Sequence, residues 1–220
     1  MKPLVIFGCG DIGQLAHFYF TSDTQRSLAG FTVDAAFRTT ENFCGLPVVP
    51  FEEVTERFPP STHDLFVAVS YNQLNRLRAN KAAEARSKGY TLASYCSSHA
   101  TVLTREPIGE NCFILEDNTV QPFVKIGRNV TLWSGNHIGH HSTIEDDCFI
   151  ASHVVISGGV RIGPRCFIGV NATLRDHITV GESSVIGAGA IILEDVPPHS
   201  VYKAAGTDRS PVPSHRLRHL

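Results

Sequence analysis

LWSGNHIGHHSTIEDDCFIASHVVISGGVRI, residues 132–162 of the chain, is the stretch that decides the fold. An aliphatic side chain returns at every sixth position of this stretch, and the count continues without an insertion from Ile108 to Ile192. The positions are Ile108, Ile114, Val120, Ile126, Leu132, Ile138, Ile144, Ile150, Ile156, Ile162, Ile168, Leu174, Val180, Ile186 and Ile192. This period fits neither an α-helix nor an alternating, half-buried strand.

A six-residue period predicts a parallel β-helix, in which each hexad forms one flat side of a triangular coil and its aliphatic residue points to the axis. Three hexads complete one coil, so residues 18 apart stack on successive coils at the strand spacing of about 4.8 Å. Cys112, Cys148 and Cys166 share the fifth position of their hexads, and we expect them to lie in the core. We place the β-helix at residues 96–200 and a tail at 201–220.

Residues 1–95 follow a different pattern, in which strands alternate with helices. The predicted strands are 4–7, 31–35 and 65–70, and the predicted helices begin with 14–20 and span 73–89. This alternation predicts a small parallel sheet covered by helices. The expected fold class is therefore a small α/β Rossmann-like domain followed by an all-β parallel β-helix.

A glycine motif, GCGDIG at residues 8–13, joins the first predicted strand to the first helix. Its glycines permit a tight turn, and the free N–H groups at the start of a helix bind phosphate. Asp34, 21 residues after Gly13, stands where a dinucleotide fold places its ribose-binding carboxylate. About 95 residues are too few for a full dinucleotide-binding sheet, so we interpret the motif as a nucleotide-sugar site. A turn that only packs helix on strand is the alternative.

The composition argues against several classes of partner. The formal net charge is −2 and no long run of Lys or Arg occurs, which disfavours nucleic acid and anionic membrane surfaces. No apolar run approaches the ~18 residues of a membrane span. The segment 1–10 has neither the basic region nor the cleavage site of a signal peptide. We therefore expect a cytoplasmic protein without nucleic-acid or membrane partners.

The 18-residue spacing of successive coils places a histidine beside a glycine. His140 is the third residue of its hexad and points away from the axis, and Gly158 occupies the same place one coil later. An imidazole can take a proton from an attacking amine or hydroxyl, while a backbone N–H can receive the oxyanion of a tetrahedral intermediate. Gly158 and Gly159 also let a thioester approach the backbone closely. This arrangement predicts acyl transfer, and an exposed histidine without a chemical role is the alternative.

Two further segments are candidates for binding coenzyme A. Gly187, Ala188 and Gly189 form a strip without large side chains, which would accept an extended pantetheine arm, or would simply close the last coils. The tail from Arg209 to Leu220 is basic, and it would either approach the phosphates of coenzyme A or remain solvated.

The histidine-rich segment also permits a zinc hypothesis. His141 and His177 are 36 residues apart, a spacing that resembles the ligand spacing of the β-helical γ-class carbonic anhydrases. Two coils separate them by about 9.6 Å, so they would share a zinc ion only across a subunit interface. The third ligand would fall on Glu182 rather than on a histidine. We therefore expect no metal in this protein.

Over nearly its whole length the chain resembles the bacterial sugar acyltransferases, which include sialic acid O-acetyltransferase and the N-acetyltransferases of nucleotide-linked 4-amino-sugars. The resemblance rests on the segments 8–13, 30–34, 67–72, 156–160 and 186–189. It implies a left-handed β-helix, a homotrimer and acetyl-CoA as cosubstrate. It also makes His140 the catalytic base and Gly158 the donor to the acetyl carbonyl. Expected catalytic residues are His140, His141 and Gly158; expected cofactor-binding residues are Gly158, Gly159, Gly187, Ala188 and Gly189; expected substrate-binding residues are Gly8, Gly10, Asp11, Ile12, Gly13, Asp34, Ser70 and Asn72.

The chain departs from this family at three places. His141 stands where the family has Asp or Glu after the base, which leaves open what orients His140. Asp146 and Asp147 are candidates if a neighbouring subunit brings them close. Residues 203–207 read KAAGT in place of the common Gly-Val-Pro-Ala-Lys ending, and Ser70 replaces a usual glycine of the amino-terminal pocket.

The leading hypothesis is acetyl transfer from acetyl-CoA to an amino group, or alternatively a hydroxyl group, of a nucleotide-linked sugar. A zinc hydratase of the γ-carbonic anhydrase type and a non-catalytic nucleotide-sugar binding protein are the other hypotheses. Metal analysis separates the hydratase from the acetyltransferase. Calorimetry with acetyl-CoA separates the acetyltransferase from the binding protein.

Overall fold

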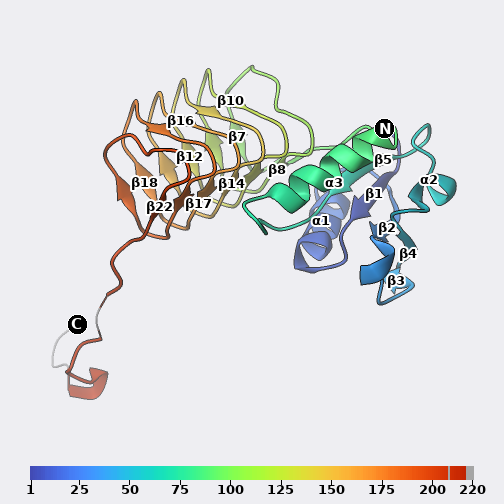
Figure 1. Cartoon of the computed structure of the whole chain (residues 1–220), viewed down its shortest axis with the longest axis horizontal. Coiled ribbons are helices and arrows are strands. Elements are labelled where there is room, and N and C mark those ends of the chain that lie inside the picture. Colours follow the sequence, from blue (N-terminus) through green and yellow to red (C-terminus); the bar gives the residue numbers. More distant parts are fainter. Residues whose placement is uncertain (208, 217–220) are drawn as a thin grey trace.

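The computed structural model describes residues 1–207 and 209–216. It consists of an amino-terminal α/β domain and a long β-helix, with the carboxy-terminal segment leaving the far end of the stack (Figure 1). The elements of the first domain are β1 Leu4–Phe7, α1 Asp11–Ser22, β2 Leu28–Val33, the 3₁₀ turn η1 Ala35–Phe37, β3 Asn42–Phe43, β4 Leu46–Pro50, α2 Val54–Arg57, β5 Asp64–Val67 and α3 Arg76–Ser87. The tail carries the 3₁₀ turn η2 Ser214–Arg216.

The sheet of the first domain has the order β3-β4-β2-β1-β5, parallel except for β3. All four residues of β1 are buried, because alternate side chains face opposite sides of the sheet. Leu4 and Ile6 pack with Ala16 and Phe20 of α1, whereas Val5 and Phe7 lie in the same apolar cluster as the α3 alanines. The predicted small parallel sheet covered by helices is confirmed, with β3 as an added antiparallel strand.

The boundaries of several predicted elements were wrong. Helix α1 begins at Asp11 instead of residue 14, because the glycine turn ends at Gly10. Strand β2 ends at Val33 rather than 35, since Asp34 precedes η1. Helix α3 begins at Arg76 because residues 73–75 have left-handed backbones, with φ between 51° and 61°. The short hairpin β3–β4 and helix α2 were not predicted.

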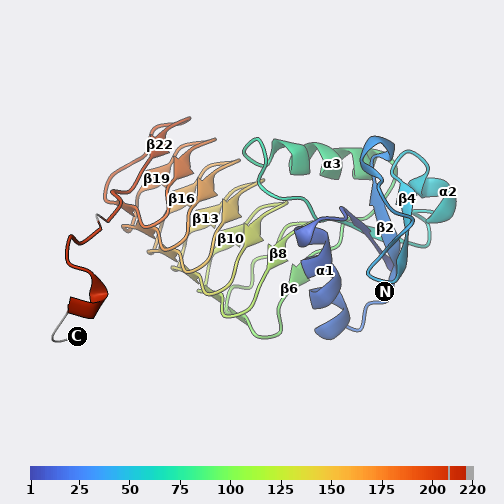
Figure 2. The same cartoon turned by 90° about the horizontal axis from the view of Figure 1, so that it is seen from below.

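The β-helix is built from two-residue strands, which are β6 Tyr95–Cys96, β7 Thr101–Val102, β8 Phe113–Ile114, β9 Thr119–Val120, β10 Lys125–Ile126, β11 Thr131–Leu132, β12 His137–Ile138, β13 Thr143–Ile144, β14 Phe149–Ile150, β15 Val155–Ile156, β16 Arg161–Ile162, β17 Phe167–Ile168, β18 Thr173–Leu174, β19 Thr179–Val180, β20 Val185–Ile186, β21 Ile191–Ile192 and β22 Val201–Tyr202. They form three parallel sheets, one for each side of the coil. The stacked coils are seen side by side in Figure 2. Most paired strands are 18 residues apart, as between Lys125 and Thr143, so the predicted register is confirmed.

In each hexad one position is buried on the axis and another forms the corner of the coil. The aliphatic residues from Ile114 to Ile192 are buried at 0–5% exposure, and Cys112, Cys148 and Cys166 are fully buried beside them. The third residue after each aliphatic position from Ile108 to Ile186 turns the corner with a positive φ of 54–77°. The corner residues are Asn111, Asp117, Phe123, Asn129, Gly135, His141, Asp147, His153, Gly159, Arg165, Asn171, His177, Ser183 and Gly189. The six-residue period therefore sets both the core and the corners.

The last coil differs from the others. Val201 pairs with Val185, only 16 residues before it, so this coil is two residues shorter than the rest. The β-helix was expected to end at residue 200, and β22 extends it by one strand beyond the Pro197-Pro198 pair.

A buried arginine of α3 joins the two domains. Arg78 is 2% exposed and donates to the carbonyl oxygens of Asn111 and Asn129 at 2.6 and 2.8 Å and to the hydroxyl of Thr131 at 2.6 Å. Burial lowers the pKa of Arg78 to about 10, so the guanidinium remains charged at neutral pH. The charge thus ties α3 to two successive coils through neutral acceptors.

Two carboxylates, one on each side, join the carboxyl end of helix α1 to the first coils. Asp23 accepts hydrogen bonds from Tyr95 Oη at 2.6 Å and from the Ser98 backbone N–H at 2.8 Å. Hydrogen bonds from Ser98 and Tyr95 lower the pKa of Asp23 to about 2. A depressed carboxyl pKa stabilises the fold above the unfolded value and loses that effect as the pH falls toward 2. Glu116 similarly accepts from Tyr19 Oη at 2.8 Å.

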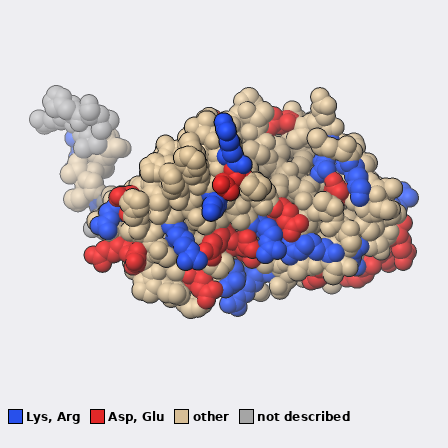
Figure 3. All heavy atoms as spheres, turned by 90° about the horizontal axis from the view of Figure 1, so that it is seen from above, with Lys and Arg blue, Asp and Glu red and all other residues tan. Residues whose placement is uncertain are grey.

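Charges of both signs are mixed on the surface. On the face shown in Figure 3, Lys and Arg lie next to Asp and Glu along the molecule, and neither sign forms a large separate patch. Opposite charges also pair directly within the chain, as in Arg128–Asp146 and Arg165–Glu182, each at 2.6 Å. Within residues 1–207 and 209–216, no helix has the length and apolar character needed to cross a membrane.

Candidate functional site

A pocket of about 560 Å³ opens in the first domain at the carboxyl ends of β1, β2 and β5. Ligands bind at this edge in parallel α/β sheets. Seven of the eight predicted substrate-binding residues line it, namely Gly8, Gly10, Asp11, Ile12, Asp34, Ser70 and Asn72. Residues from three separate parts of the chain therefore meet around one cavity, as the glycine motif predicts.

The glycine motif has two different structural roles. Gly8 has φ +119°, and a Cβ there would lie 2.5 Å from the Ala68 carbonyl oxygen. Gly13, the eighth predicted residue, does not line the pocket, and a Cβ on it would lie 2.1 Å from the Gly8 oxygen. Gly13 therefore lets α1 pack closely on the turn, whereas Gly10 has open space around it at the start of α1.

Lys81 is a pocket residue that was not predicted. Its ammonium group donates to Asp34 at 2.7 Å and to Glu84 at 2.9 Å, and its side chain is 12% exposed. Burial disfavours the charge, but the hydrogen bonds to Asp34 and Glu84 outweigh it and raise the pKa of Lys81. Nothing in the sequence of α3 distinguishes Lys81 from its other basic residues, because its partner Asp34 is 47 residues away.

On the β-helix, the His140 ring lies directly over Gly158. A Cβ on Gly158 would be 2.7 Å from His140 Cε1 and 2.8 Å from Nε2, so only glycine fits beneath the ring. The Gly158 N–H donates no hydrogen bond to any of the residues described, whereas the next N–H, of Gly159, donates to the His140 carbonyl at 2.8 Å. An exposed imidazole thus stands beside an available backbone donor.

The His140 backbone is held by its neighbours. Its N–H donates to Oε1 of Gln121 on the preceding coil at 2.8 Å. Nδ1 of His140 lies 3.1 Å from Nδ1 of His141, with the two rings nearly perpendicular at 85°. The His141 ring in turn packs on Phe123, with ring centroids 4.7 Å apart. His141 therefore occupies a fixed place between the base and the preceding corner.

The two aspartates considered as orienting groups have other partners within the chain. Asp146 accepts from Arg128 through both carboxylate oxygens, at 2.6–3.1 Å. Asp147 accepts from the Asn129 side chain at 2.7 Å. Neither contacts His140 in the chain described.

The histidines that suggested a zinc site remain apart. Gly159 lies between His141 and His177 in the same corner column, and a Cβ on it would be 2.4 Å from His177 Nδ1. Across residues 1–207 and 209–216, no three side chains of His, Cys, Asp or Glu come together in a way that would hold a metal ion.

The strip at residues 187–189 lies partly under the last strand. The Gly187 N–H donates to the Tyr202 carbonyl at 2.7 Å, and a Cβ on Gly187 would lie 2.9 Å from that oxygen. Gly189, at a corner with φ +72°, has open space around it. Of the basic tail, Arg209 and Arg216 are exposed, and Arg218 lies outside the described residues.

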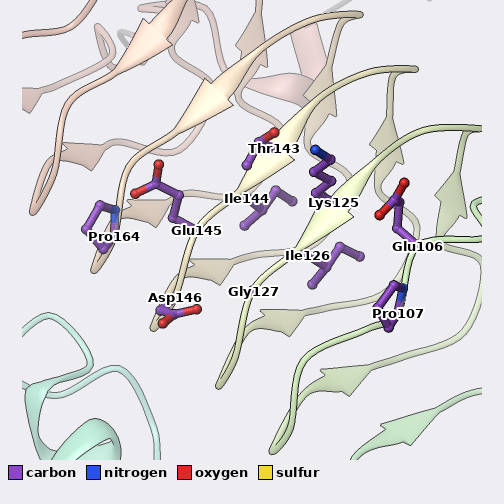
Figure 4. A pocket seen from close by; sticks show the side chains of 10 residues that line it. All are labelled: Glu106, Pro107, Lys125, Ile126, Gly127, Thr143, Ile144, Glu145, Asp146 and Pro164. Carbon is purple, nitrogen blue, oxygen red and sulfur yellow. The ribbon is translucent and has the colours of Figure 1, made fainter.

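A second hollow of about 530 Å³ lies over strands β10 and β13 of the β-helix (Figure 4). Lys125 and Thr143 of β10 and β13 line it together with Glu145 and Asp146 at the following corner. Glu145 is already paired with Arg161 at 2.5 Å. The lining contains neither His nor Cys, and Asp146 is likewise paired, with Arg128.

The β-helix matches the family described as "Bacterial transferase hexapeptide (six repeats)" over residues 108–140, 123–158, 141–176 and 159–194. Galactoside O-acetyltransferase from Escherichia coli (strain K12) is 36% identical over 110 residues. That alignment covers 44% of this chain and 44% of the enzyme, so the chain spans less than half the length of this relative.

Two solved structures are similar over almost the entire chain. One is a histidine-to-asparagine variant of perosamine N-acetyltransferase from Caulobacter crescentus in complex with CoA and GDP-perosamine. Its TM-score is 0.83 at 23% sequence identity, and the match covers 93% of this chain and 94% of that chain. The other is the acetyltransferase domain of PglB from Neisseria gonorrhoeae FA1090 in complex with acetyl coenzyme A, with a TM-score of 0.64, 24% identity, and coverage of 92% and 96%. The likeness confirms the predicted fold, a Rossmann-like domain followed by a left-handed parallel β-helix.

Proposed function

Since residues 108–194 match the family of bacterial hexapeptide transferases, we propose that the chain transfers an acetyl group from acetyl-CoA to an amino or hydroxyl group of a nucleotide-linked sugar. The observation that carries this proposal is the His140 ring over Gly158, beside an N–H that has no partner among the described residues. The glycine-rich pocket of the first domain supplies the place for the nucleotide.

In this reaction the acceptor nitrogen or oxygen attacks the thioester carbonyl carbon while His140 takes its proton. The carbonyl oxygen becomes an oxyanion, which the Gly158 N–H stabilises by a hydrogen bond. Collapse of the tetrahedral intermediate breaks the carbon–sulfur bond and releases CoA, whose thiolate recovers the proton from His140. The acetylated sugar and CoA are the products.

Substrate binding follows from the pocket's construction. The start of α1, at Gly10 and Asp11, offers backbone N–H groups to a phosphate, and Asp34 offers a carboxylate to hydroxyl or N–H groups of the nucleoside. Gly158, Gly159 and the strip 187–189 would accept the pantetheine arm. We propose a cytoplasmic homotrimer, in which neighbouring subunits complete the site.

The proposal is tested by following acetyl-CoA consumption with a panel of UDP-, dTDP- and GDP-linked amino sugars, each beside the corresponding sugar without the amino group. Turnover with at least one nucleotide sugar is expected, and the matched pair tells amine from hydroxyl transfer. If calorimetry finds nucleotide-sugar binding but neither acetyl-CoA binding nor turnover, the protein is a binding protein and the proposed reaction is wrong.

Gly158→Ala is expected to lower kcat by about 10²-fold, because the new methyl group displaces the His140 ring from its position and misplaced groups lose this much rate. Steady-state kinetics measure the effect. Gly135→Ala is the control, because its Cβ also meets an imidazole, that of His153 at 2.4 Å, at a corner without a proposed role. Its left-handed backbone, with φ +77°, makes it the harsher structural change of the two. An equal loss of kcat in both variants would contradict a specific role for the His140–Gly158 pair.

Lys81→Met is expected to raise KM for the nucleotide sugar by about 10-fold and to leave KM for acetyl-CoA unchanged, because Asp34 loses the charge-assisted hydrogen bond that fixes it in the pocket. Lys125→Met removes a lysine from the hollow on the β-helix and serves as the control. A change in KM for acetyl-CoA alone would place Lys81 outside the nucleotide site.

A further inference from the structure

His141 stands directly after the proposed base, where the family that the chain resembles has Asp or Glu, and its ring contacts the ring of His140. Nδ1 of His140 and Nδ1 of His141 lie 3.1 Å apart, within hydrogen-bond distance. Because each neutral imidazole carries one proton, one ring must donate and the other must accept. We infer that His141 is a positioning residue, which accepts the Nδ1–H of His140 as a neutral imidazole and holds the base in the tautomer with a free Nε2.

This inference rests on the proposed acetyl transfer, which requires His140 to take a proton. Its Nε2 is the nitrogen nearer to Gly158, at 2.8 Å from a Cβ placed there, compared with 3.1 Å for Nδ1. A base that acts through Nε2 must carry its own proton on Nδ1. The only acceptor within reach of that proton in the described residues is Nδ1 of His141, which assigns the direction of the hydrogen bond.

The position of His141 is set by two packing features. Its backbone lies in the left-handed region at φ +60°, as at every corner, which sends its side chain along the corner column. Its ring packs on Phe123 of the preceding coil, and Gly159 occupies the same column one coil later. The imidazole is therefore held from one side and has a glycine on the other.

Few charged groups surround this pair. On the preceding coil, residues 121–123 are Gln, Pro and Phe, and on the following coil, residues 157–159 are Ser, Gly and Gly. The titratable neighbours are His137 on the same coil and Asp176 and His177 one coil beyond Gly158, with both of the latter well exposed at 61% and 75%. No carboxylate among the described residues contacts either ring of the pair.

A neutral acceptor has a definite consequence for pH dependence. A carboxylate would stabilise the imidazolium form of His140 and make the base take up its proton at a higher pH. A neutral imidazole gives no such charge stabilisation, so replacing His141 by a carboxylate shows which kind of acceptor the base uses.

Three substitutions of His141 separate these effects. In Asn, Oδ1 is bonded to Cγ as Nδ1 is in His, so His141→Asn keeps a neutral acceptor at the same place, and Asn tolerates the left-handed backbone. His141→Asp places a charged acceptor there. His141→Phe keeps a ring on Phe123 but removes the acceptor. His153→Asn, at another corner with φ 57°, controls for the substitution itself.

The kinetic test measures the pH profile of kcat/KM, in which activity falls as pH drops through the midpoint of the base. His141→Asn is expected to retain kcat/KM within about 3-fold and His141→Phe to lose about 10-fold. His141→Asp is expected to move the acid midpoint up by about one pH unit. Wild-type kcat/KM in the Phe variant, or an unmoved midpoint in the Asp variant, would overturn the inference.

Nitrogen NMR of the full-length protein with labelled histidine imidazoles separates this inference from the proposed reaction. His140 is expected to show a protonated Nδ1 and a bare Nε2 at alkaline pH, in wild type and His141→Asn but not in His141→Phe. This signature without acetyl transfer on any sugar would support the pairing while refuting the reaction. Turnover in a protein whose His140 carries its proton on Nε2 would refute the pairing and leave the reaction standing.

Discussion

Replacing His140 by Ala is expected to lower kcat for acetyl transfer by about 10²- to 10⁴-fold, the usual contribution of a positioned general base. The loss is expected to be larger for a hydroxyl acceptor than for an amine, because part of an amine is already unprotonated and nucleophilic. Acetyl-CoA consumption with the preferred sugar measures the effect. The size of the loss therefore reports the chemical nature of the acceptor.

The fold should not change in this variant, because the His140 side chain is exposed and the axis beneath it is formed by Ile138. His137→Ala, three residues earlier on β12, is the control, and it is expected to keep kcat within about 3-fold since the ring points outward from a different position of the hexad. Full activity of the His140→Ala enzyme would remove His140 from the mechanism.

Arg78→Met is expected to reduce the free energy of unfolding by about 2–4 kcal/mol. Three buried acceptors lose their donor, namely the Asn111 and Asn129 carbonyls and the Thr131 hydroxyl, and each buried unsatisfied group costs about 1–3 kcal/mol. Relief of the cost of burying the guanidinium offsets part of this sum. Urea unfolding followed by far-UV circular dichroism measures the change.

Arg76→Met, on the exposed side of the same helix, is the matched control and is expected to change stability by less than about 0.5 kcal/mol. Arg78→Lys keeps a charge but has no planar fork to reach three acceptors, so its stability is expected to lie between the wild type and Arg78→Met. An Arg78→Met protein as stable as the control would show that the two domains do not depend on this contact.

The β-helix could be predicted in detail because one rule applies along its length. The axis residues, the core cysteines and the 18-residue register all follow from the count that begins at Ile108. The same count placed His140 beside Gly158, since both are third residues of their hexads. The count did not show that the fourth residue of each hexad adopts a left-handed backbone. Phe123 and Arg165 occupy this position, and these residue types do not predict a positive φ.

The contacts between distant segments could not be predicted. Lys81 meets Asp34, and Arg78 meets the corner at Asn129, only after both domains have formed. Helix α3 reads as an ordinary basic helix, so neither residue stands out. The sequence showed that His141 replaces the usual Asp or Glu. Its contact with His140 could not be predicted, because it depends on the side-chain direction that the left-handed backbone of the corner imposes.

The shortened last coil lies at the end of the stack opposite the amino-terminal domain (Figure 1). The amino-terminal domain covers one end of the stack through Arg78, whereas strands β19, β21 and β22 are the last in their sheets at the other end. Such strand edges can recruit another chain and grow into fibres. The Pro197-Pro198 pair lies in this final turn, and proline has no N–H to offer an incoming strand. An incoming strand would therefore find no backbone donor at these two positions.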